Sequence, residues 1–366
     1  MKIVADQNMP FVREFFGQFG EVYMMPGRDI CGDVIIDADM LLVRSVTPVN
    51  QNLLAGSSVK FVGSATAGID HIDRQYLVNN NIQFAFAPGC NAQAVVEYVL
   101  SCLCSLSSEW QGKRVGIVGF GNVGSRLYQS LKALDMVTHV YDPFLAPNSL
   151  PDLCTFDDLF DCDIISLHTP LTTDGPYPTL HMFDNKALRR LKAGSVLINS
   201  SRGGVVDNQA LLDILSVDRH FSVVLDVWEG EPSINKDLLD LTTIATPHIA
   251  GYSDLGKIKG TLMLFEAAQA LFTPSQQTDI SDLINEPPIQ LALQSSGITD
   301  VLMATYNVTA DDQRFRDAIA CSDLPLADVF DNFRKHYPQR REYSCYGVHK
   351  DHTSIKQLVD LGFGVI

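Results

Sequence analysis

The sequence has few basic residues: its 366 residues include 27 Lys and Arg against 43 Asp and Glu, a net charge of −16. Nucleic acids and anionic membranes attract clustered positive charge, so this composition argues against both as partners. An anionic small substrate would need a local basic pocket. Long apolar runs are also lacking, because none approaches the roughly 18 residues that span a bilayer. The start MKIVADQNMP is typical of a first strand rather than a signal peptide, and we expect a soluble, cytoplasmic protein.

Cysteine spacings typical of metal or redox sites are lacking too. The eight cysteines include no C-x-x-C pair. We interpret them as reduced thiols that pack as small apolar residues. The segment HKDH, residues 349–352, has no convincing third ligand nearby in the sequence, so no metal is expected.

Apolar residues make up 46% of the chain, enough for the two or three domains that its length suggests. The first 90 residues or so alternate short apolar strands with helical segments, the rhythm of a parallel sheet. From Asn91 a long helix is predicted, and six more strands follow it, which match a doubly wound sheet. These strands are RVGIV, THVYD, DIISLHTP, SVLINS, SVVLDVW and TIATPH.

This pattern predicts an α/β protein with two doubly wound parallel-sheet domains and an active-site cleft between them. The helical run IKGTLMLFEAAQALF can return the chain to its first block, so residues 1–90 and 254–280 form one predicted domain and 91–253 the other. A breaker-rich segment then leads to a small α+β unit, residues 286–366. A small sheet with an open edge often pairs with its twin, so we expect this unit to dimerise the protein.

The segment KRVGIVGFGNVGSRL carries a G-x-G-x-x-G pattern between a predicted strand and a predicted helix. In that context the glycines allow a tight turn, close approach of a pyrophosphate and close helix packing. Asp142 ends the next strand, about 20 residues on, where a carboxylate binds both ribose hydroxyls and repels the extra phosphate of NADP. The sequence therefore predicts NAD as cofactor. The expected contacts in this loop are Gly119, Gly121, Asn122, Val123 and Gly124.

Ionisable residues follow three later strands, at the edge where open α/β sheets bind ligands. Arg202 lies in INSSRGGVVD, Asp226 and Glu231 in LDVWEGEP, and His248 in TPHIAGYS. A guanidinium can bind a carboxylate through two hydrogen bonds. An imidazole titrates near neutral pH and can take the proton of a hydroxyl group, and a nearby carboxylate favours its protonated form. Together with NAD, Arg202, Glu231 and His248 form a constellation suited to hydride transfer.

In this order, GFGNVG, the Asp142 strand end, SSRGGVVD, DVWEGEP and TPHIAGYS resemble the NAD-dependent D-2-hydroxyacid dehydrogenase family. The resemblance implies that Arg202, Glu231 and His248 are the catalytic set. It also implies that Ser45, Thr66 and Tyr252 bind substrate along with Arg202. NAD contacts that it implies are Asp142, Thr169, Asp226 and Gly251.

Within that family, VRSVTPVN, SATAGIDHID and the short C-terminal unit resemble a branch that oxidises 4-phospho-D-erythronate at C2, on a route to pyridoxal phosphate. The residues that hold the distal phosphate stay open. Arg44 beside Ser45 is one candidate, and Arg340 or Arg341, reaching a partner subunit's cleft, are others.

Two other interpretations remain. The chain could be another enzyme of the same class, such as a phosphoglycerate dehydrogenase or a general 2-keto acid reductase. It could also be a non-enzymatic NAD-sensing protein on the same scaffold. Such a sensor could be a corepressor, but the lack of a basic surface for DNA argues against that role.

Overall fold

The computed structural model describes residues 1–273, 288–291 and 297–366. The chain divides into two compact units: Met1–Asn91 with Tyr252–Pro287, and Ala92–Gly251 with Pro288–Ile366. The first comes close to the predicted substrate domain, and the second joins the predicted NAD-binding and C-terminal segments. The predicted fold class is confirmed: the chain has two parallel α/β sheets and a small C-terminal α+β region.

The first unit is built on a five-stranded parallel sheet in the order β2-β1-β3-β4-β5. Its strands are β1 (Lys2–Asp6), β2 (Glu21–Met25), β3 (Met40–Val43), β4 (Phe61–Ser64) and β5 (Gln83–Phe86). Its helices are α1 (Val12–Phe16), α2 (Gly32–Ile35), α3 (Gln51–Leu54), α4 (Arg74–Asn79) and α10 (Asp254–Leu271). Every residue of β3 and β4 is buried, as expected of parallel strands covered on both faces.

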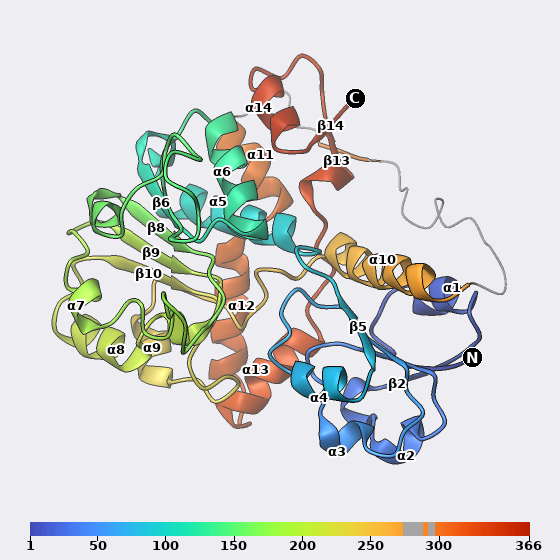
Figure 1. Cartoon of the computed structure of the whole chain (residues 1–366). Coiled ribbons are helices and arrows are strands. Elements are labelled where there is room, and N and C mark those ends of the chain that lie inside the picture. The colour runs from blue at the N-terminus through green and yellow to red at the C-terminus, as the bar shows by residue number, and fades with distance from the viewer. Residues whose placement is uncertain (274–287, 292–296) are drawn as a thin grey trace. The chain divides into compact units, whose positions relative to one another are not determined.

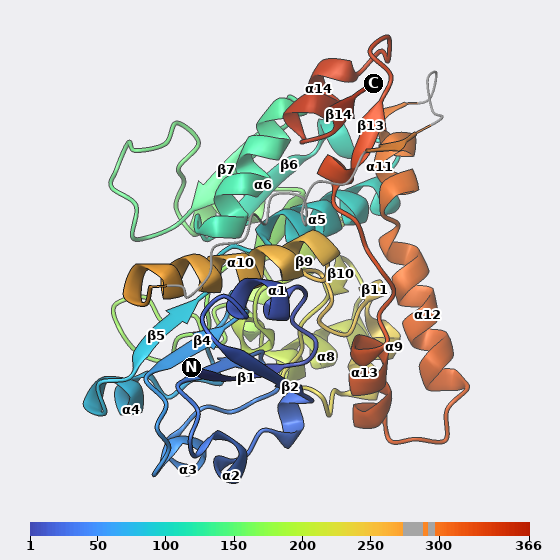
Figure 2. The ribbon, with the colours of Figure 1, turned by 90° about the vertical axis from the view of Figure 1, so that its right-hand side faces the viewer.

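Helix α10 follows the second unit's sheet in the sequence and covers one face of the first unit's sheet beside α1 (Figure 2). Phe265 stacks on Phe15 with ring centroids 5.6 Å apart, and Leu264 is fully buried in the same cluster. The predicted return of the chain to its first block is therefore what completes this core. The edge strand β2 was not predicted, because EVYMM is short and only Val22 is buried in it.

The second unit holds a six-stranded parallel sheet in the order β11-β10-β9-β8-β6-β7. Its strands are β6 (Arg114–Val118), β7 (Val137–Tyr141), β8 (Ile164–Leu167), β9 (Val196–Asn199), β10 (Ser222–Leu225) and β11 (Ile244–Ala245). Its helices are α5 (Ala92–Leu106), α6 (Asn122–Ala133), α7 (Asn185–Leu188), α8 (Asn208–Val217) and α9 (Lys236–Leu241). All six predicted strands are present.

Helices cover both faces of this sheet (Figure 1). One apolar cluster joins α5 and α6 to inward residues such as Ile117 and Ile198. The other joins α7, α8 and α9 to residues of opposite orientation such as Val118 and Leu197. The strand order reverses between β6 and β8, and ligands of doubly wound sheets bind outside the carboxyl ends at such a point.

The C-terminal segment adds helices and a three-stranded parallel sheet in the order β12-β13-β14. Its elements are β12 (Ile289–Gln290), α11 (Ile298–Thr305), α12 (Val308–Ala320), α13 (Leu326–Lys335), β13 (Tyr346–Val348), α14 (Ile355–Asp360) and β14 (Gly364–Val365). The helix predicted from Asp311 begins earlier, at Val308, because the Asn307 side chain caps it by accepting from the Thr309 N–H.

Candidate active site

Three neighbouring strands of the second unit end beside the predicted catalytic residues. Leu225 of β10 pairs with Asn199 of β9 and with Ala245 of β11, so these three carboxyl ends lie in one row. Arg202, Glu231 and His248 follow β9, β10 and β11 respectively. The sheet therefore brings the loops that carry the three residues to one edge.

His248 and Glu231 form a direct pair, with Nδ1 of the imidazole 2.7 Å from Oε2 of the carboxylate. The other carboxylate oxygen of Glu231 accepts a 2.8 Å hydrogen bond from the Trp228 N–H. Burial works against ionisation of Glu231, but the charge and hydrogen bond of His248 and the Trp228 N–H together lower its pKa. Glu231 is therefore ionised at neutral pH and holds His248 by Nδ1, which directs Nε2 away from the pair.

The backbone of His248 is left-handed, with φ of 57°. For a residue with a side chain this conformation costs about 1–3 kcal/mol and persists only where the surroundings enforce it. The enforcing group is Asp226: its carbonyl accepts from the His248 N–H at 2.6 Å, and its carboxylate accepts from the N–H groups of Ile249 and Ala250 at 2.8 and 3.0 Å. The strain is thus stored in a loop fixed by one buried carboxylate.

Asp226 was predicted as an NAD contact. Its side chain is 1% exposed, and it also accepts a 2.7 Å hydrogen bond from the Thr246 hydroxyl. Burial raises the pKa of Asp226, although His248, Thr246 and the two loop N–H groups oppose that effect. What the structure describes is its support of the His248 loop, and its contact with NAD stays a prediction.

Arg202 is half-buried, and its guanidinium donates to the Ser201 carbonyl at 2.8 Å, which limits its rotation. The next residue, Gly203, packs against the backbone of Trp228: a Cβ there would lie 2.0 Å from the Trp228 carbonyl oxygen. Only glycine permits that approach. It holds the Arg202 loop directly against the loop that carries Glu231.

The glycine-rich loop links β6 to α6. Gly124 is required by close packing, since a Cβ would lie 1.9 Å from the Gly119 carbonyl oxygen. Asp142 at the end of β7 binds this loop, because its carboxylate accepts from the Phe120 N–H at 2.8 Å and from the Phe144 N–H at 3.0 Å. Each oxygen accepts one of these two bonds, so both can still accept from ribose hydroxyls.

Two further observations fit a dinucleotide at this edge. A Cβ on Gly121 would meet no atom within 4 Å, so the fold leaves open space where a pyrophosphate would approach the start of α6. The Thr169 hydroxyl, just after β8, is buried without a hydrogen-bond partner among the described residues. Such a hydroxyl can accept or donate a hydrogen bond to a bound ligand. The residues present therefore fit NAD.

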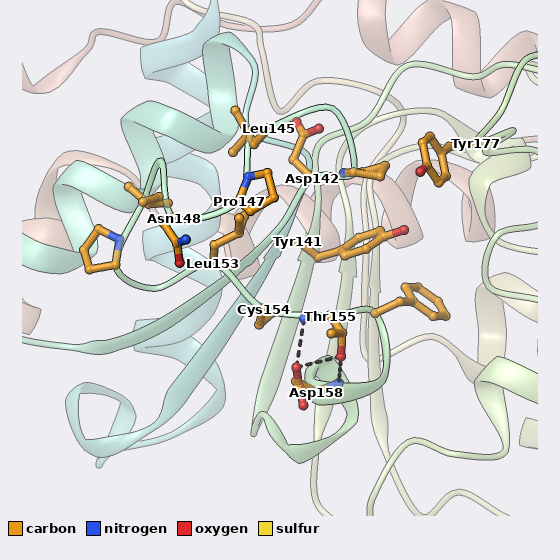
Figure 3. A pocket seen from close by; sticks show the side chains of 14 residues that line it. Tyr141, Asp142, Leu145, Pro147, Asn148, Leu153, Cys154, Thr155, Asp158 and Tyr177 are labelled. Atoms are coloured by element: carbon orange, nitrogen blue, oxygen red, sulfur yellow. Dashed lines mark hydrogen bonds between the residues drawn. The ribbon is translucent and has the colours of Figure 1, made fainter.

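A cavity of about 700 Å³ opens beside Asp142 (Figure 3). Tyr141, Asp142 and Tyr177 line one end of it, and Cys154, Thr155 and Asp158 line the other. Asp158 accepts hydrogen bonds from the N–H and hydroxyl of Thr155 at 2.8 and 2.6 Å, which fixes that wall. The cavity borders the strand end at which the ribose of NAD is expected.

The predicted substrate residues of the first unit also follow neighbouring strands. Ser45 comes after β3 and Thr66 after β4, and Val43 of β3 pairs with Ser64 of β4. Ser45 is exposed, whereas the Thr66 hydroxyl lies 2.7 Å from the Ser64 hydroxyl and donates to the Gly68 carbonyl at 2.8 Å. Both residues thus lie at the ligand-binding edge of their own sheet.

Lys257 was not predicted from the sequence. It lies in the first turns of α10, with its Nζ 5.7 Å from the centre of the Tyr252 ring. Burial lowers the pKa of Lys257, the nearby charge of Arg44 lowers it further, and Asp254 partly opposes both. It lies one turn after the cap Ser253, and no sequence motif singles it out.

Arg340 was considered as a phosphate ligand in a partner's cleft, and the structure contradicts this. Its side chain is 5% exposed, and its terminal nitrogens donate to the carbonyls of Ala250 and Ala94 of its own chain. Burial of Arg340 could not be read from the sequence, because both of its carbonyl partners lie far away in the chain.

Among the described residues, one group of side chains is arranged as metal ligands are: His181, Asp207 and Glu229, with ligand atoms within 4.8 Å of one another. These residues already bind one another. His181 Nε2 lies 2.7 Å from a Glu229 oxygen, and Nδ1 lies 3.7 Å from Asp207. The hydrogen bond to Glu229 raises the pKa of His181 against the opposing effect of burial, and the charges of Glu229 and Asp207 add to the rise.

Comparison with known families and proteins gives matches over the whole chain. Residues 102–250 match the model of the D-isomer specific 2-hydroxyacid dehydrogenase NAD-binding domain, and residues 284–362 match a domain of unknown function, DUF3410. The erythronate-4-phosphate dehydrogenase of Cellvibrio japonicus is 46% identical, over 95% of this chain and 94% of that protein. The enzyme of the same name from Escherichia coli O1:K1 is 44% identical, over 100% and 99%.

Solved structures share the fold over about three quarters of the chain. The NAD⁺-bound 3-phosphoglycerate dehydrogenase of Entamoeba histolytica superposes with a TM-score of 0.64 and 25% identity, over 75% of this chain and 96% of that one. The D-lactate dehydrogenase of Aquifex aeolicus gives 0.63 at 22% identity, over 74% and 95%. NAD is thereby established as the cofactor. In the described ranges, no helix has the length and apolar character needed to cross a membrane.

Proposed function

Because this chain belongs to the erythronate-4-phosphate dehydrogenase family, we propose that it oxidises 4-phospho-D-erythronate at C2 to 2-oxo-3-hydroxy-4-phosphobutanoate. Bound NAD supplies the acceptor for the hydride that leaves C2. The observation that carries the proposal is the 2.7 Å pair of His248 and Glu231 at the edge where a nicotinamide is expected. The product belongs to a route to pyridoxal phosphate.

His248 acts as the base in this reaction. Glu231 accepts the Nδ1 proton, so the neutral imidazole presents the lone pair of Nε2 to the C2 hydroxyl. As the hydroxyl proton moves to Nε2, the O–H bond breaks and a C=O bond forms at C2. The C2–H bond breaks at the same time, and its hydrogen leaves with both electrons as hydride. Glu231 stabilises the imidazolium that results, and in the reverse direction His248 returns the proton.

Arg202 binds the C1 carboxylate of the substrate through two nitrogens of its guanidinium. Two parallel hydrogen bonds fix both the position and the plane of the carboxylate, and so align C2 for transfer. The short tether to the Ser201 carbonyl supports this role, because it reduces the conformational freedom lost on binding. Ser45, Thr66 and Tyr252 contact the rest of the substrate.

Arg44 and Lys257 bind the distal phosphate. Burial is the main cause of the lowered pKa of Lys257, and the charge of Arg44 lowers it slightly further against the larger opposing effect of Asp254. The two basic side chains therefore lie near enough to interact, and a phosphate dianion could pair with both. In the variants Arg44→Ala and Lys257→Met we expect KM for phosphoerythronate to rise about tenfold or more, since each loses a charged hydrogen bond. KM for unphosphorylated erythronate should stay within about twofold. Equal effects on both substrates would remove these residues from the phosphate site.

NAD binds along the carboxyl edge of β6, β7 and β8. Gly119, Gly121, Asn122, Val123 and Gly124 receive the pyrophosphate, and Asp142 the ribose. Thr169, Asp226 and Gly251 complete the contacts with NAD. The free hydroxyl of Thr169 supports this assignment.

A substrate panel tests the function. Wild type and His248→Asn are given NAD with phosphoerythronate, phosphoglycerate and unphosphorylated hydroxy acids, and bound or released NADH is followed by absorbance. We expect the highest turnover on phosphoerythronate and its loss in the variant. Faster turnover of phosphoglycerate would favour the alternative enzyme. No NADH from any hydroxy acid, with a protein partner bound stoichiometrically, would favour an NAD sensor.

The described part of the C-terminal segment supports a homodimer formed by residues 286–366. Its small sheet leaves Ile289, Val365 and Ile366 exposed at 37, 54 and 37%. Apolar side chains at sheet edges favour pairing with a second copy. Light scattering of the purified protein should give twice the chain mass, and Val365→Asp should lower the measured mass towards that of one chain.

We further propose a cytoplasmic enzyme with no nucleic-acid or membrane partner, as the net charge of −16 supports.

A further inference from the structure

We propose that Arg340, from the C-terminal segment, is a positioning residue that fixes the His248 loop for catalysis. The inference rests on the proposed function, since it assigns His248 the role of base. Arg340 lies between α13 and β13 and donates from one terminal nitrogen to the Ala250 carbonyl at 3.0 Å and from the other to the Ala94 carbonyl at 2.6 Å. Both bonds are buried.

The loop that carries His248 is held from two sides. Its N–H groups, from His248 to Ala250, donate to Asp226. Arg340 binds the carbonyl of Ala250, the last residue of the same stretch. Asp226 thus holds the peptide before Ala250, and Arg340 holds the peptide after it. The two charged groups together hold the left-handed turn at His248, and with it the direction of the imidazole.

The second bond ties this loop to the start of α5. Ala94 lies in the first turn of α5, directly after the chain passes from the first unit to the second at Asn91, and Ala250 lies directly before it passes back at Gly251. One guanidinium therefore joins both connections between the units. An ammonium group has no planar fork, so a lysine there would reach only one of the two carbonyls in good geometry.

The guanidinium is itself held in place. It lies 3.5 Å from the centre of the Tyr306 ring, and the Tyr306 hydroxyl donates to Asp311 at 2.9 Å. The chain just beyond it is docked on α5, since the Tyr343 N–H donates to an oxygen of the buried Glu97 carboxyl group at 2.8 Å. A cation between a ring face and two carbonyls, on an anchored segment, is a rigid support.

Arg316 provides a matched control. It too belongs to the C-terminal segment and donates to two carbonyls of the second unit, those of Leu239 and Thr242, at 3.1 and 2.8 Å. These carbonyls lie at the end of α9, before β11, and do not belong to the His248 loop. Arg316 also donates to Asp312 at 2.8 Å, and the same Asp312 oxygen accepts from the Ala245 N–H of β11. Loss of Arg316 therefore removes a partly buried clamp next to β11 that makes no bond to residues 248–250.

The test compares Arg340→Ala, Arg340→Lys and Arg316→Ala by Tm, NADH affinity, kcat, KM and the pH profile of kcat with phosphoerythronate. In Arg340→Ala, kcat per NADH-binding site should fall about tenfold or more, because small displacements of a catalytic group are costly, while KM changes less than about threefold. Its pH profile should shift. The kcat of Arg340→Lys should lie between those of Arg340→Ala and wild type. Added guanidinium ion should restore part of the activity of Arg340→Ala. Arg316→Ala should lower Tm but keep kcat and the pH profile.

Three outcomes would overturn the inference: wild-type kcat and pH profile in Arg340→Ala, a loss of activity no larger than the loss of folded protein, or the same kcat loss in Arg316→Ala. If Arg340→Ala does not fold, Arg340→Lys decides by the same readouts. If the wild type oxidises no hydroxy acid, the proposed function fails separately. The inference is then tested by the NMR titration of the His248 imidazole, assigned with His248→Asn, which must change in Arg340→Lys and not in Arg316→Ala.

Discussion

His248 with Glu231 and His181 with Glu229 are two histidine–glutamate pairs that draw their carboxylates from one loop. Both have nitrogen–oxygen distances of 2.7 Å, and both histidines have left-handed backbones, with φ of 57° and 51°. They differ in the second ring nitrogen. That of His181 faces Asp207 at 3.7 Å, whereas Nε2 of His248 has no hydrogen-bond partner among the described residues.

The comparison shows that the pair alone does not define a catalytic base. An imidazole that bonds one carboxylate and faces a second favours a structural role, because its remaining nitrogen points at a negative charge rather than at open space for a substrate. Glu229 supports this interpretation, since its second oxygen accepts from the Asn208 N–H at 2.9 Å at the start of α8. An imidazole with one carboxylate keeps a nitrogen for chemistry.

The largest expected effect comes from exchanging each histidine in turn for asparagine. His248→Asn should lower kcat by about 10²–10⁴, the usual worth of a positioned base. His181→Asn should leave kcat within about twofold of wild type. Initial rates of NADH formation at saturating phosphoerythronate measure both. Comparable losses in the two variants would abolish the distinction drawn between the pairs.

Replacing the carboxylates should give a smaller difference in the same direction. Glu231→Gln should lower kcat by about 10², because an amide cannot stabilise the imidazolium and allows the wrong tautomer. Glu229→Gln should change kcat less than about twofold and lower Tm slightly. Steady-state rates and thermal unfolding of both variants decide. If Glu231→Gln kept full turnover, Glu231 would be structural, like Glu229.

The smallest effects concern stability, and they have opposite pH windows. The pKa of Glu231 is lowered from 4.5, so its contribution is present above pH 4.5 and is lost as pH falls through the folded-state value. The pKa of His181 is raised from 6.5, so its contribution is complete below pH 6.5 and is lost as pH rises through its folded-state value. The side chain of His181 is 41% exposed, which limits that pair to less than about 1 kcal/mol.

Tm measured against pH resolves the two windows. The difference in Tm between wild type and Glu231→Gln should shrink on acidification. That between wild type and His181→Asn should shrink on the alkaline side of pH 6.5. A single shared window would mean that the two pairs titrate as one network.

Much of this site could be predicted because its residues follow strands that the sequence marks clearly. β9, β10 and β11 are apolar runs that end in polar loops, and parallel strands place their carboxyl ends together. The location of Arg202, Glu231 and His248 at one edge of the sheet therefore followed from the order of these strands. The glycine pattern before α6 and Asp142 after β7 followed in the same way.

What was not predicted depends on contacts between distant segments. Glu229 was not singled out from the sequence, because its partner His181 lies 48 positions earlier. Arg340 bonds carbonyls 90 and 246 positions away, and no local pattern indicates such bonds. Strand β2 has a single buried residue, which gives too weak an alternation to separate it from a loop.

The covering of the first sheet by α10 has a consequence for synthesis of the chain on the ribosome. Phe15, Phe16 and Phe19 are made early, but their partner Phe265 is made only after the whole second sheet. The nascent first unit therefore emerges with an aromatic face exposed, and it waits through some 180 further residues of translation at about 5–20 residues per second. We expect chaperones to bind it during those seconds, whereas the second sheet can form from consecutive sequence.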